Sequence, residues 1–127
     1  MSTDIAALTH SAASHGASDL FLSAGAIPRA RIGGSLATLG DTPLDASAMR
    51  EFWQNCGANP DTDHDFDTSH VDPAGNRFRV NLYRHLGQAA AVLRHIKSKI
   101  PDLTTLGLPA ELLQSWMGYP SGLVLVT

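Results

Sequence analysis

Three arginines, Arg77, Arg79 and Arg94, are the residues of this 127-residue sequence best suited to chemistry. Guanidinium groups form paired hydrogen bonds with phosphate oxygens, and strands hold side chains in place better than loops do. Arg77 and Arg79 alternate with apolar residues in RFRVNLYR, which predicts a strand that exposes both of them on one face. Arg94 lies in QAAAVLRHI, the expected partner strand beyond Gly87. The pattern predicts a cationic row able to contact phosphate; the alternative is that these arginines pair with the acidic segment that precedes them.

The segment DTDHDFDTSH, residues 61–70, is the candidate for metal binding because aspartate and histidine dominate it. An EF-hand loop that began at Asp61 would need glycine at its sixth position and glutamate at its twelfth. The sequence has Phe66 and Asp72 at those positions. The six histidines and Cys56 also lack the short paired spacing of structural zinc ligands. We therefore expect no metal site and interpret the segment as a solvated acidic loop, with metal binding as the alternative.

No catalytic residues are recognisable in the chain. Cys56 lies on the apolar side of a predicted helix, where a thiol is usually buried and unreactive. The glycines of AGAIPRARIGG, residues 24–34, are not followed by the Lys-Ser/Thr and helix of a phosphate-binding loop. We therefore expect that this chain is not an enzyme by itself.

Composition and charge limit the class of protein. The chain has 43% hydrophobic residues, one cysteine and a formal net charge of −3. A core can form without disulfides, a single cysteine favours a reducing compartment, and an acidic balance disfavours nucleic-acid binding. No apolar run reaches the roughly 18 residues that span a bilayer, and no signal peptide is recognisable. We expect a cytoplasmic protein without nucleic-acid binding or direct membrane insertion.

The hydrophobic pattern predicts the elements that must position the arginines. One helix is expected between a cap at Thr3 or Asp4 and Gly16, and a second within PLDASAMREFWQNCG. Alternation and turn signals predict five strands, near residues 19–23, 29–32, 35–39, 77–84 and 88–96. These elements together predict an α+β domain, an antiparallel sheet with helices packed on one face.

The chain changes character at Pro101. Helical spacing of apolar residues after Pro109 predicts one short helix in a connecting segment. The last eight residues, PSGLVLVT, form a continuous apolar run bounded by proline and glycine, typical of a strand buried on both faces of a parallel sheet. No further strand of this chain follows to pair with it, so we expect it to begin another domain.

Four stretches match a known family in the same order: GASDLFLSAGAIPRARIGGSL, RFRVNLYRHLGQAAAVLRHI, IPDLTTLGLPAELL and GLVLVT. Together they resemble the N-terminal region of the type IV pilus retraction ATPases, from the secretion ATPase superfamily. The resemblance implies a PAS-like N-terminal domain over residues 1–100, an interdomain connector over 101–119, and the first strand of a RecA-like ATPase domain over 120–127. In the family a Walker A loop follows that strand, so we expect the chain to be truncated just before it.

The same resemblance implies a role for the arginines. Members of the family form homohexameric rings in which the N-terminal domain of one subunit packs on the ATPase core of the next. The family's nucleotide-site arginines correspond to Arg77, Arg79 and Arg94, which would then contact nucleotide in trans. The full-length parent would use ATP and magnesium, whereas this chain is expected to hold no cofactor. Its expected partners are the neighbouring ATPase cores and the pilus or secretion machinery at the bacterial inner membrane.

The sequence departs from the family at three motifs, and in one of them Lys97 stands where the family's Arg-x-Ile-Pro has proline. The histidine of the family's Asp-Leu-His is Phe21 here, and the arginine of its Gln-Arg-Gly is Leu86. We therefore expect no nucleotide contact from either residue. An alternative function also stays open, namely a free-standing PAS-like module that binds a ligand or a protein and has no ATPase activity.

Overall fold

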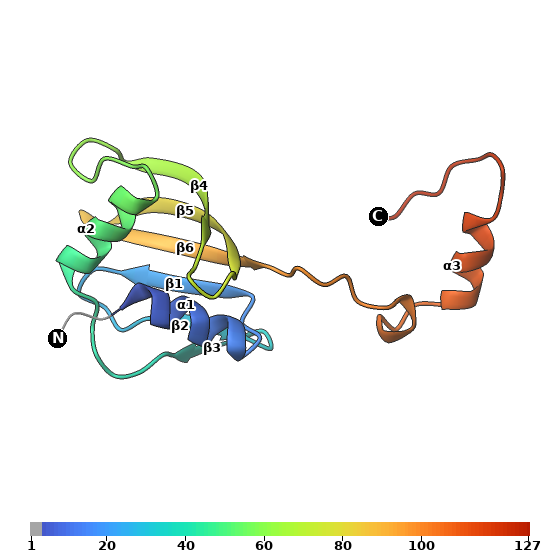
Figure 1. The fold of residues 1–127 in the computed structure, drawn as a ribbon, viewed down its shortest axis with the longest axis horizontal. Helices are drawn as coiled ribbons and strands as arrows, with labels where there is room; N and C mark the ends of the chain where they lie inside the picture. The colour runs from blue at the N-terminus through green and yellow to red at the C-terminus, as the bar shows by residue number, and fades with distance from the viewer. Residues whose placement is uncertain (1–3) are drawn as a thin grey trace. The chain divides into compact units, whose positions relative to one another are not determined.

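The structure is a computed structural model that describes residues 4–127 of the chain. It divides into two units, Met1–Lys97 and Ser98–Thr127, which are described separately. The first unit contains a β-sheet and two helices, and the second contains a short 3₁₀ helix and one α-helix (Figure 1). No helix within residues 4–127 is long and apolar enough to cross a membrane.

The first unit is built on a six-stranded sheet in which every neighbouring pair of strands is antiparallel. The strands are β1 (Asp19–Ser23), β2 (Arg29–Ile32), β3 (Ser35–Thr38), β4 (Asp65–Val71), β5 (Arg77–His85) and β6 (Gln88–Ile96). Their order across the sheet is β3-β2-β1-β6-β5-β4, so β1 and β6 are central neighbours although they lie far apart in the sequence. All five strands expected from the sequence are present, and β4 is an additional one.

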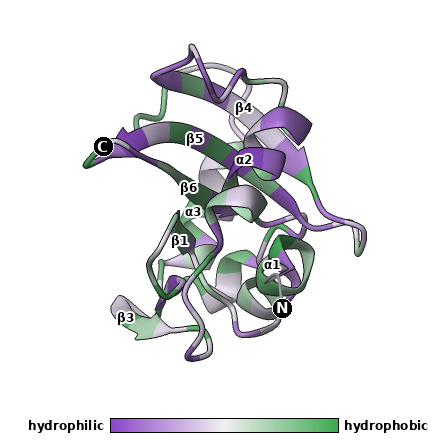
Figure 2. Ribbon diagram, turned by 90° about the vertical axis from the view of Figure 1, so that its left-hand side faces the viewer, coloured by the Kyte–Doolittle hydropathy of each residue, from purple (hydrophilic) through white to green (hydrophobic). Residues whose placement is uncertain are grey.

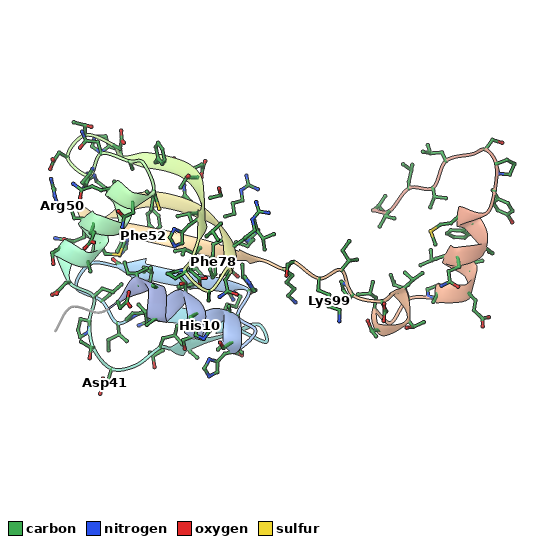
Figure 3. All side chains as sticks on the ribbon, viewed as in Figure 1. His10, Asp41, Arg50, Phe52, Phe78 and Lys99 are labelled. Atoms are coloured by element: carbon green, nitrogen blue, oxygen red, sulfur yellow. The ribbon has the colours of Figure 1, made fainter. Side chains whose placement is uncertain are left out.

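Helices α1 (Ile5–Ser14) and α2 (Ala46–Asn55) pack on one face of this sheet (Figure 1). Figure 3 shows Phe52 on α2 and Phe78 on β5, and both side chains belong to the buried cluster that joins helices and sheet. Burial of an apolar side chain of this size contributes about 1.5–3 kcal/mol. Trp53 is fully buried, and its indole N–H donates to the Ala90 carbonyl oxygen at 3.2 Å. The predicted α+β class is therefore confirmed.

Local signals explain both helices. The Asp4 carboxylate accepts a hydrogen bond from the backbone N–H of Ala6 at 3.0 Å and caps α1, and Gly16 follows the helix with a φ of +69°. The alternative cap, Thr3, lies outside the described residues. In α2 the apolar residues face the sheet, whereas Figure 2 shows much of the rest of this helix as hydrophilic. This division of faces is what a helix on the surface of a core requires.

Strand β4 corrects the interpretation of residues 61–70 as a solvated acidic loop. From Asp65 onward this segment pairs with β5 over its whole length. Its residues alternate between exposed and half-buried, and Phe66, Thr68 and His70 are the half-buried ones. Aspartate and serine disfavour strands, but pairing with a long neighbouring strand and burial of one face outweigh that preference.

The second unit contains the 3₁₀ helix η1 (Leu103–Thr105) and the helix α3 (Ala110–Met117), in agreement with the predicted short helix. Residues 122–127 have no regular secondary structure, and the apolar side chains from Leu123 to Val126 are exposed. A strand is defined by its pairing, and no described strand pairs with this segment. The predicted domain boundaries, with residues 120–127 in a further domain, therefore stay predictions.

Candidate functional site

The sheet face opposite the helices carries the predicted arginines. On β5, Arg77 and Arg79 are exposed and alternate with the buried Phe78 and Val80. On β6, Arg94 is exposed and is the direct cross-strand partner of Arg79. Directly paired residues point to the same face, with Cβ atoms about 4.5–5.5 Å apart. The structure therefore brings the three arginines together, and their contact with nucleotide stays a prediction.

A fourth arginine and a carboxylate extend this row across the sheet. Arg94, Asp19 and Arg31 are successive cross-strand partners on β6, β1 and β2. The Nε–H of Arg94 donates to Asp19 Oδ1 at 3.2 Å, and the Nε of Arg31 lies 3.6 Å from Asp19 Oδ2. The Ser18 hydroxyl also donates to Oδ2, at 2.8 Å. Asp19 is only 9% exposed, so its charge is nearly enclosed by these partners.

Sequence reasoning did not select Asp19 or Arg31 as site residues. The alternation in RARI could have indicated Arg31, because it places Arg29 and Arg31 on the same face of β2, with the buried Ala30 between them on the other face. The contact between Asp19 and Arg94 could not be predicted from the sequence, because β1 and β6 become neighbours only through the topology of the sheet.

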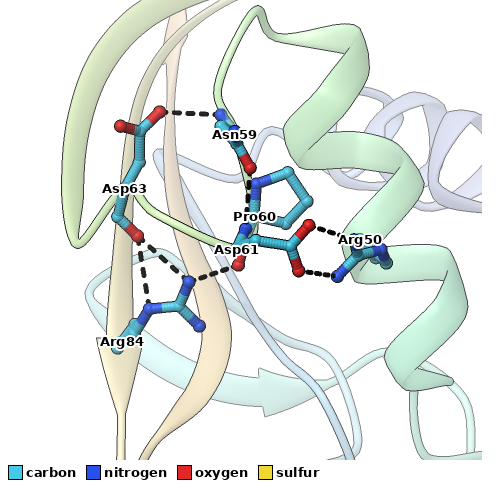
Figure 4. A network of polar contacts seen from close by, with 6 residues as sticks. All are labelled: Arg50, Asn59, Pro60, Asp61, Asp63 and Arg84. Atoms are coloured by element: carbon cyan, nitrogen blue, oxygen red, sulfur yellow. Dashed lines mark hydrogen bonds and ion pairs between the residues drawn. The ribbon is translucent and has the colours of Figure 1, made fainter.

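The acidic segment before β4 is bound by other arginines (Figure 4). Arg50 on α2 donates two hydrogen bonds to the Asp61 carboxylate, at 2.8 and 2.6 Å. These hydrogen bonds and the charge of Arg50 hold the pKa of Asp61 below its usual value. Arg84 donates to the Asp63 carbonyl oxygen at 3.2 and 3.1 Å and to the Pro60 carbonyl oxygen. The alternative, in which the three row arginines neutralise this segment, is not observed.

Arg77 and Arg79 keep their charge available to another molecule. Within residues 4–127, the salt bridges involve Arg31, Arg50 and Arg94 only. Arg77 and Arg79 are exposed and lie near Arg94, so like charges are concentrated at this end of the sheet face. Such a group of guanidinium groups attracts anions, and phosphate oxygens match its donor geometry.

A groove lies elsewhere on the first unit, between the start of α1, helix α2 and the end of β4. Its volume is about 540 Å³, and its lining includes Asp4, Glu51, Phe52, His70 and Asp72. Burial lowers the pKa of His70, against the opposing effect of the Asp72 charge. No group of three or more side chains suited to holding a metal ion is found within residues 4–127.

The sequence is similar to two curated pilus proteins of Pseudomonas aeruginosa. The type IV pilus retraction ATPase PilT is 35% identical over 98% of this chain. The chain is a homologue of PilT. The type IV pilus ATPase PilU is 33% identical over 87% of the chain. The chain spans 37% of the length of PilT and 30% of that of PilU, and no family model matches the sequence.

The structural comparison also finds PilT, together with DotB ATPases. The crystal structure of the pilus retraction motor PilT with bound ADP matches with a TM-score of 0.68 and 30% identity, over 88% of this chain and 34% of that one. The DotB ATPase of Legionella pneumophila matches with a TM-score of 0.66 and 23% identity, over 85% and 33% of the two chains. The DotB ATPase of Yersinia pseudotuberculosis matches with a TM-score of 0.72 and 19% identity, over 91% of this chain and 36% of that one. Both DotB matches show the fold alone. The matches to PilT in sequence and in structure confirm the family resemblance, and the fold is that of the PilT N-terminal domain.

Proposed function

We propose that this chain is the N-terminal part of a type IV pilus retraction ATPase of the PilT type. In this proposal the chain is not an enzyme itself. It assembles with the ATPase cores of neighbouring subunits in a homohexameric ring and completes their nucleotide sites in trans. The observation that carries the proposal is the row of Arg77, Arg79 and Arg94 on the open sheet face of a PilT homologue.

The proposed role of these arginines is electrostatic. ATP with bound magnesium supplies the phosphoryl group, and negative charge on its oxygens must be stabilised during transfer. Guanidinium groups from the N-terminal domain of a neighbouring subunit stabilise this charge, and that domain needs no hydrolytic residue for this role. In well-studied GTPases, an arginine supplied in trans raises kcat by a factor of about 10³–10⁵. The exposed side chains of Arg77 and Arg79 fit this role, and we expect the residues that hold ATP and magnesium to lie in the ATPase core.

We further propose the domain assignment that the resemblance implies: a PAS-like domain over residues 1–100, a connector over 101–119 and the first strand of the RecA-like core over 120–127. The exposure of the apolar side chains from Leu123 to Val126 supports this assignment. A strand of this composition is stable between neighbouring strands. The connector is then the place where domain and core rotate relative to each other. The whole protein acts in the bacterial cytoplasm with the pilus or secretion machinery at the inner membrane.

A chimeric motor tests the proposed function. Residues 1–127 replace the matching part of Pseudomonas aeruginosa PilT, and ATP hydrolysis by the purified ring is measured. We expect the chimera to hydrolyse ATP, and we expect joint replacement of Arg77, Arg79 and Arg94 by glutamine to lower kcat by roughly 100-fold or more. Arg29→Gln is the matched control, because Arg29 is exposed on the same sheet face but lies outside the row. Size-exclusion chromatography separates loss of turnover from loss of the ring.

Mixed rings test whether the arginines act in trans. Subunits with the triple glutamine change are combined with subunits whose ATPase core lacks the P-loop lysine, so neither kind is active alone. We expect mixing to restore part of the activity, because some sites then combine an intact lysine with intact arginines from the neighbour. Unchanged kcat in the triple variant, or no recovery in mixed rings that assemble normally, would contradict the proposal.

A further inference from the structure

Asp19 differs from the other acidic residues of the open sheet face. Asp65 and Asp67 are exposed on the edge strand β4, whereas Asp19 is 9% exposed on the central strand β1. It lies between two arginines of the neighbouring strands, Arg94 and Arg31. A nearly enclosed carboxylate requires such partners, since loss of water disfavours an isolated charge. Asp19 is therefore tied to the arginine row rather than to solvent.

The contact with Asp19 uses only one part of the Arg94 guanidinium group. The Nε–H donates to Oδ1 at 3.2 Å, and no hydrogen bond of the terminal nitrogens is found within residues 4–127. The Arg94 side chain is still 75% exposed. A guanidinium group has five N–H donors in a rigid plane, and only one of them is on Nε. Asp19 thus binds the Nε–H of the Arg94 guanidinium group and leaves the terminal N–H groups for another oxygen ligand.

The carboxylate is itself held in a fixed orientation. Its Oδ2 accepts a hydrogen bond from the Ser18 hydroxyl at 2.8 Å and lies 3.6 Å from the Nε of Arg31. The Arg31 guanidinium carbon in turn lies 5.7 Å from the centroid of the Phe21 ring. One oxygen of Asp19 is therefore directed at Arg94, and the other at Ser18 and Arg31.

We propose that Asp19 is a positioning residue that orients Arg94 toward phosphate, with Arg31 as the second cation that fixes the carboxylate. This inference rests on the proposed function of the arginine row. Holding a side chain in place before binding removes an entropy cost that corresponds to about 2- to 10-fold in affinity. Arg79, the direct neighbour of Arg94, has no carboxylate partner within residues 4–127 and serves as the comparison.

A double-mutant cycle on the 127-residue chain separates orientation from charge. Sodium tripolyphosphate is the probe, and its affinity is measured by calorimetry for the wild type, Asp19→Asn, Arg94→Lys and the double variant. Lysine keeps the charge but has a single nitrogen, so it cannot donate from two edges. In the Arg94→Lys background, loss of the Asp19 charge should tighten binding by about 2-fold. In the wild-type background we expect no tightening, because the lost orientation offsets the gain in charge.

A spectroscopic measurement reports on the contact directly. In the NMR spectrum of the wild type, we expect the Nε–H signal of Arg94 to be resolved and slow to exchange with water. In Asp19→Asn this signal should move to the position of a free arginine, while the Nε–H of the unpaired Arg79 should stay the same. Thermal unfolding of each variant shows whether the fold is intact. If Asp19→Asn does not fold, the comparison of Arg94→Lys with Arg79→Lys decides, and the former should weaken binding more.

The possible failures are distinguishable. Equal tightening by Asp19→Asn in both backgrounds, an unchanged Arg94 Nε–H signal, or equal weakening by Arg94→Lys and Arg79→Lys would overturn the positioning role and leave the arginine row in place. If tripolyphosphate affinity is unchanged when Arg77, Arg79 and Arg94 are all glutamine, the row does not bind phosphate. The proposed function is then contradicted, and the positioning role falls with it.

Discussion

Asp72 connects helix α1 to the turn that precedes strand β5, and its replacement is predicted to destabilise the fold strongly. The side chain is 4% exposed. It accepts hydrogen bonds from the Thr9 hydroxyl at 3.0 Å, from the backbone N–H groups of Ala74 and Asn76 at 3.0 and 2.8 Å, and from the Asn76 amide at 2.9 Å. Arg77, the first residue of β5, follows this turn directly.

The size of the effect follows from these four donors. A hydrogen bond to a charged acceptor contributes about 1.5–3 kcal/mol, and contributions within one network are not additive. The donors of the turn regain water when the carboxylate is removed, and the buried Thr9 hydroxyl can donate instead to the Ala6 carbonyl oxygen, 2.9 Å away. We therefore expect Asp72→Ala to lower the free energy of unfolding by about 3–4 kcal/mol and Thr9→Val to lower it by about 1 kcal/mol.

The pH dependence has a definite sign. Burial raises the pKa of Asp72, but the hydrogen bonds from Asn76, Thr9 and Ala74 outweigh it, so the pKa in the folded state lies below the ordinary 3.8. A carboxylate with a lowered folded-state pKa contributes stability above its unfolded pKa and loses it as the pH falls through the folded value. The difference between wild type and Asp72→Asn should therefore be largest above about pH 4 and shrink below it.

Urea unfolding at pH 7 and pH 3, followed by circular dichroism, measures both effects. Asp61→Ala is the matched control, because Asp61 also has a lowered pKa but is exposed and paired only at the surface with Arg50. We expect no measurable change in stability for that variant. A loss below about 1 kcal/mol for Asp72→Ala at pH 7, or an equal loss at both pH values for Asp72→Asn, would refute the reasoning.

Three further predictions concern single residues. Leu86 is 89% exposed at the β5–β6 turn with a φ of +50°, so Leu86→Asn should raise the free energy of unfolding in urea by about 1 kcal/mol; a decrease would contradict this. Burial raises the pKa of the Cys56 thiol to about 11, so its alkylation by iodoacetamide at pH 8 should be roughly 100-fold slower than that of an exposed cysteine. Burial lowers the pKa of His70, so its stabilising contribution is present above about pH 6.5 and is lost as the pH falls through the folded-state value. His70→Gln should therefore reduce the loss of stability between pH 7 and pH 5 in urea unfolding, and an unchanged loss would show that other groups cause it.

Most of the fold could be predicted because its elements have clear periodicity. RFRVNLYR alternates strictly and is part of β5, and the apolar residues of α2 recur at helical spacing. Strand β4 was missed because its alternation is formed by Phe66, Thr68 and His70 between aspartates and a serine, which are poor strand formers. Its existence depends on the neighbouring strand, and pairing across a sheet is not a local property of the sequence.

The candidate site was predictable only in part, for the same reason. Arg77 and Arg79 follow from the alternation of one strand, and Arg94 from that of the next one along the chain. The contact of Asp19 with Arg94 depends on the pairing of β1 with β6, which no local pattern encodes. The acidic segment near Asp61 suggested a partner for the arginines, but it is bound by Arg50 and Arg84 because α2 and the end of β5 lie closer to it.

The packing of the hydrophobic core determines on which face of the sheet the arginines lie. Leu93 is fully buried opposite Val80, and Arg94 is its neighbour on the other face of β6. A shift of β6 by one residue would place Leu93 in solvent and turn Arg94 into the core. Burial of an unpaired guanidinium group costs several kcal/mol and exposure of a leucine about 2 kcal/mol more, so the shifted register is excluded. Because the core fixes the register, it also fixes where the three arginines lie on the sheet, and Arg79 keeps its place there without a carboxylate partner within residues 4–127.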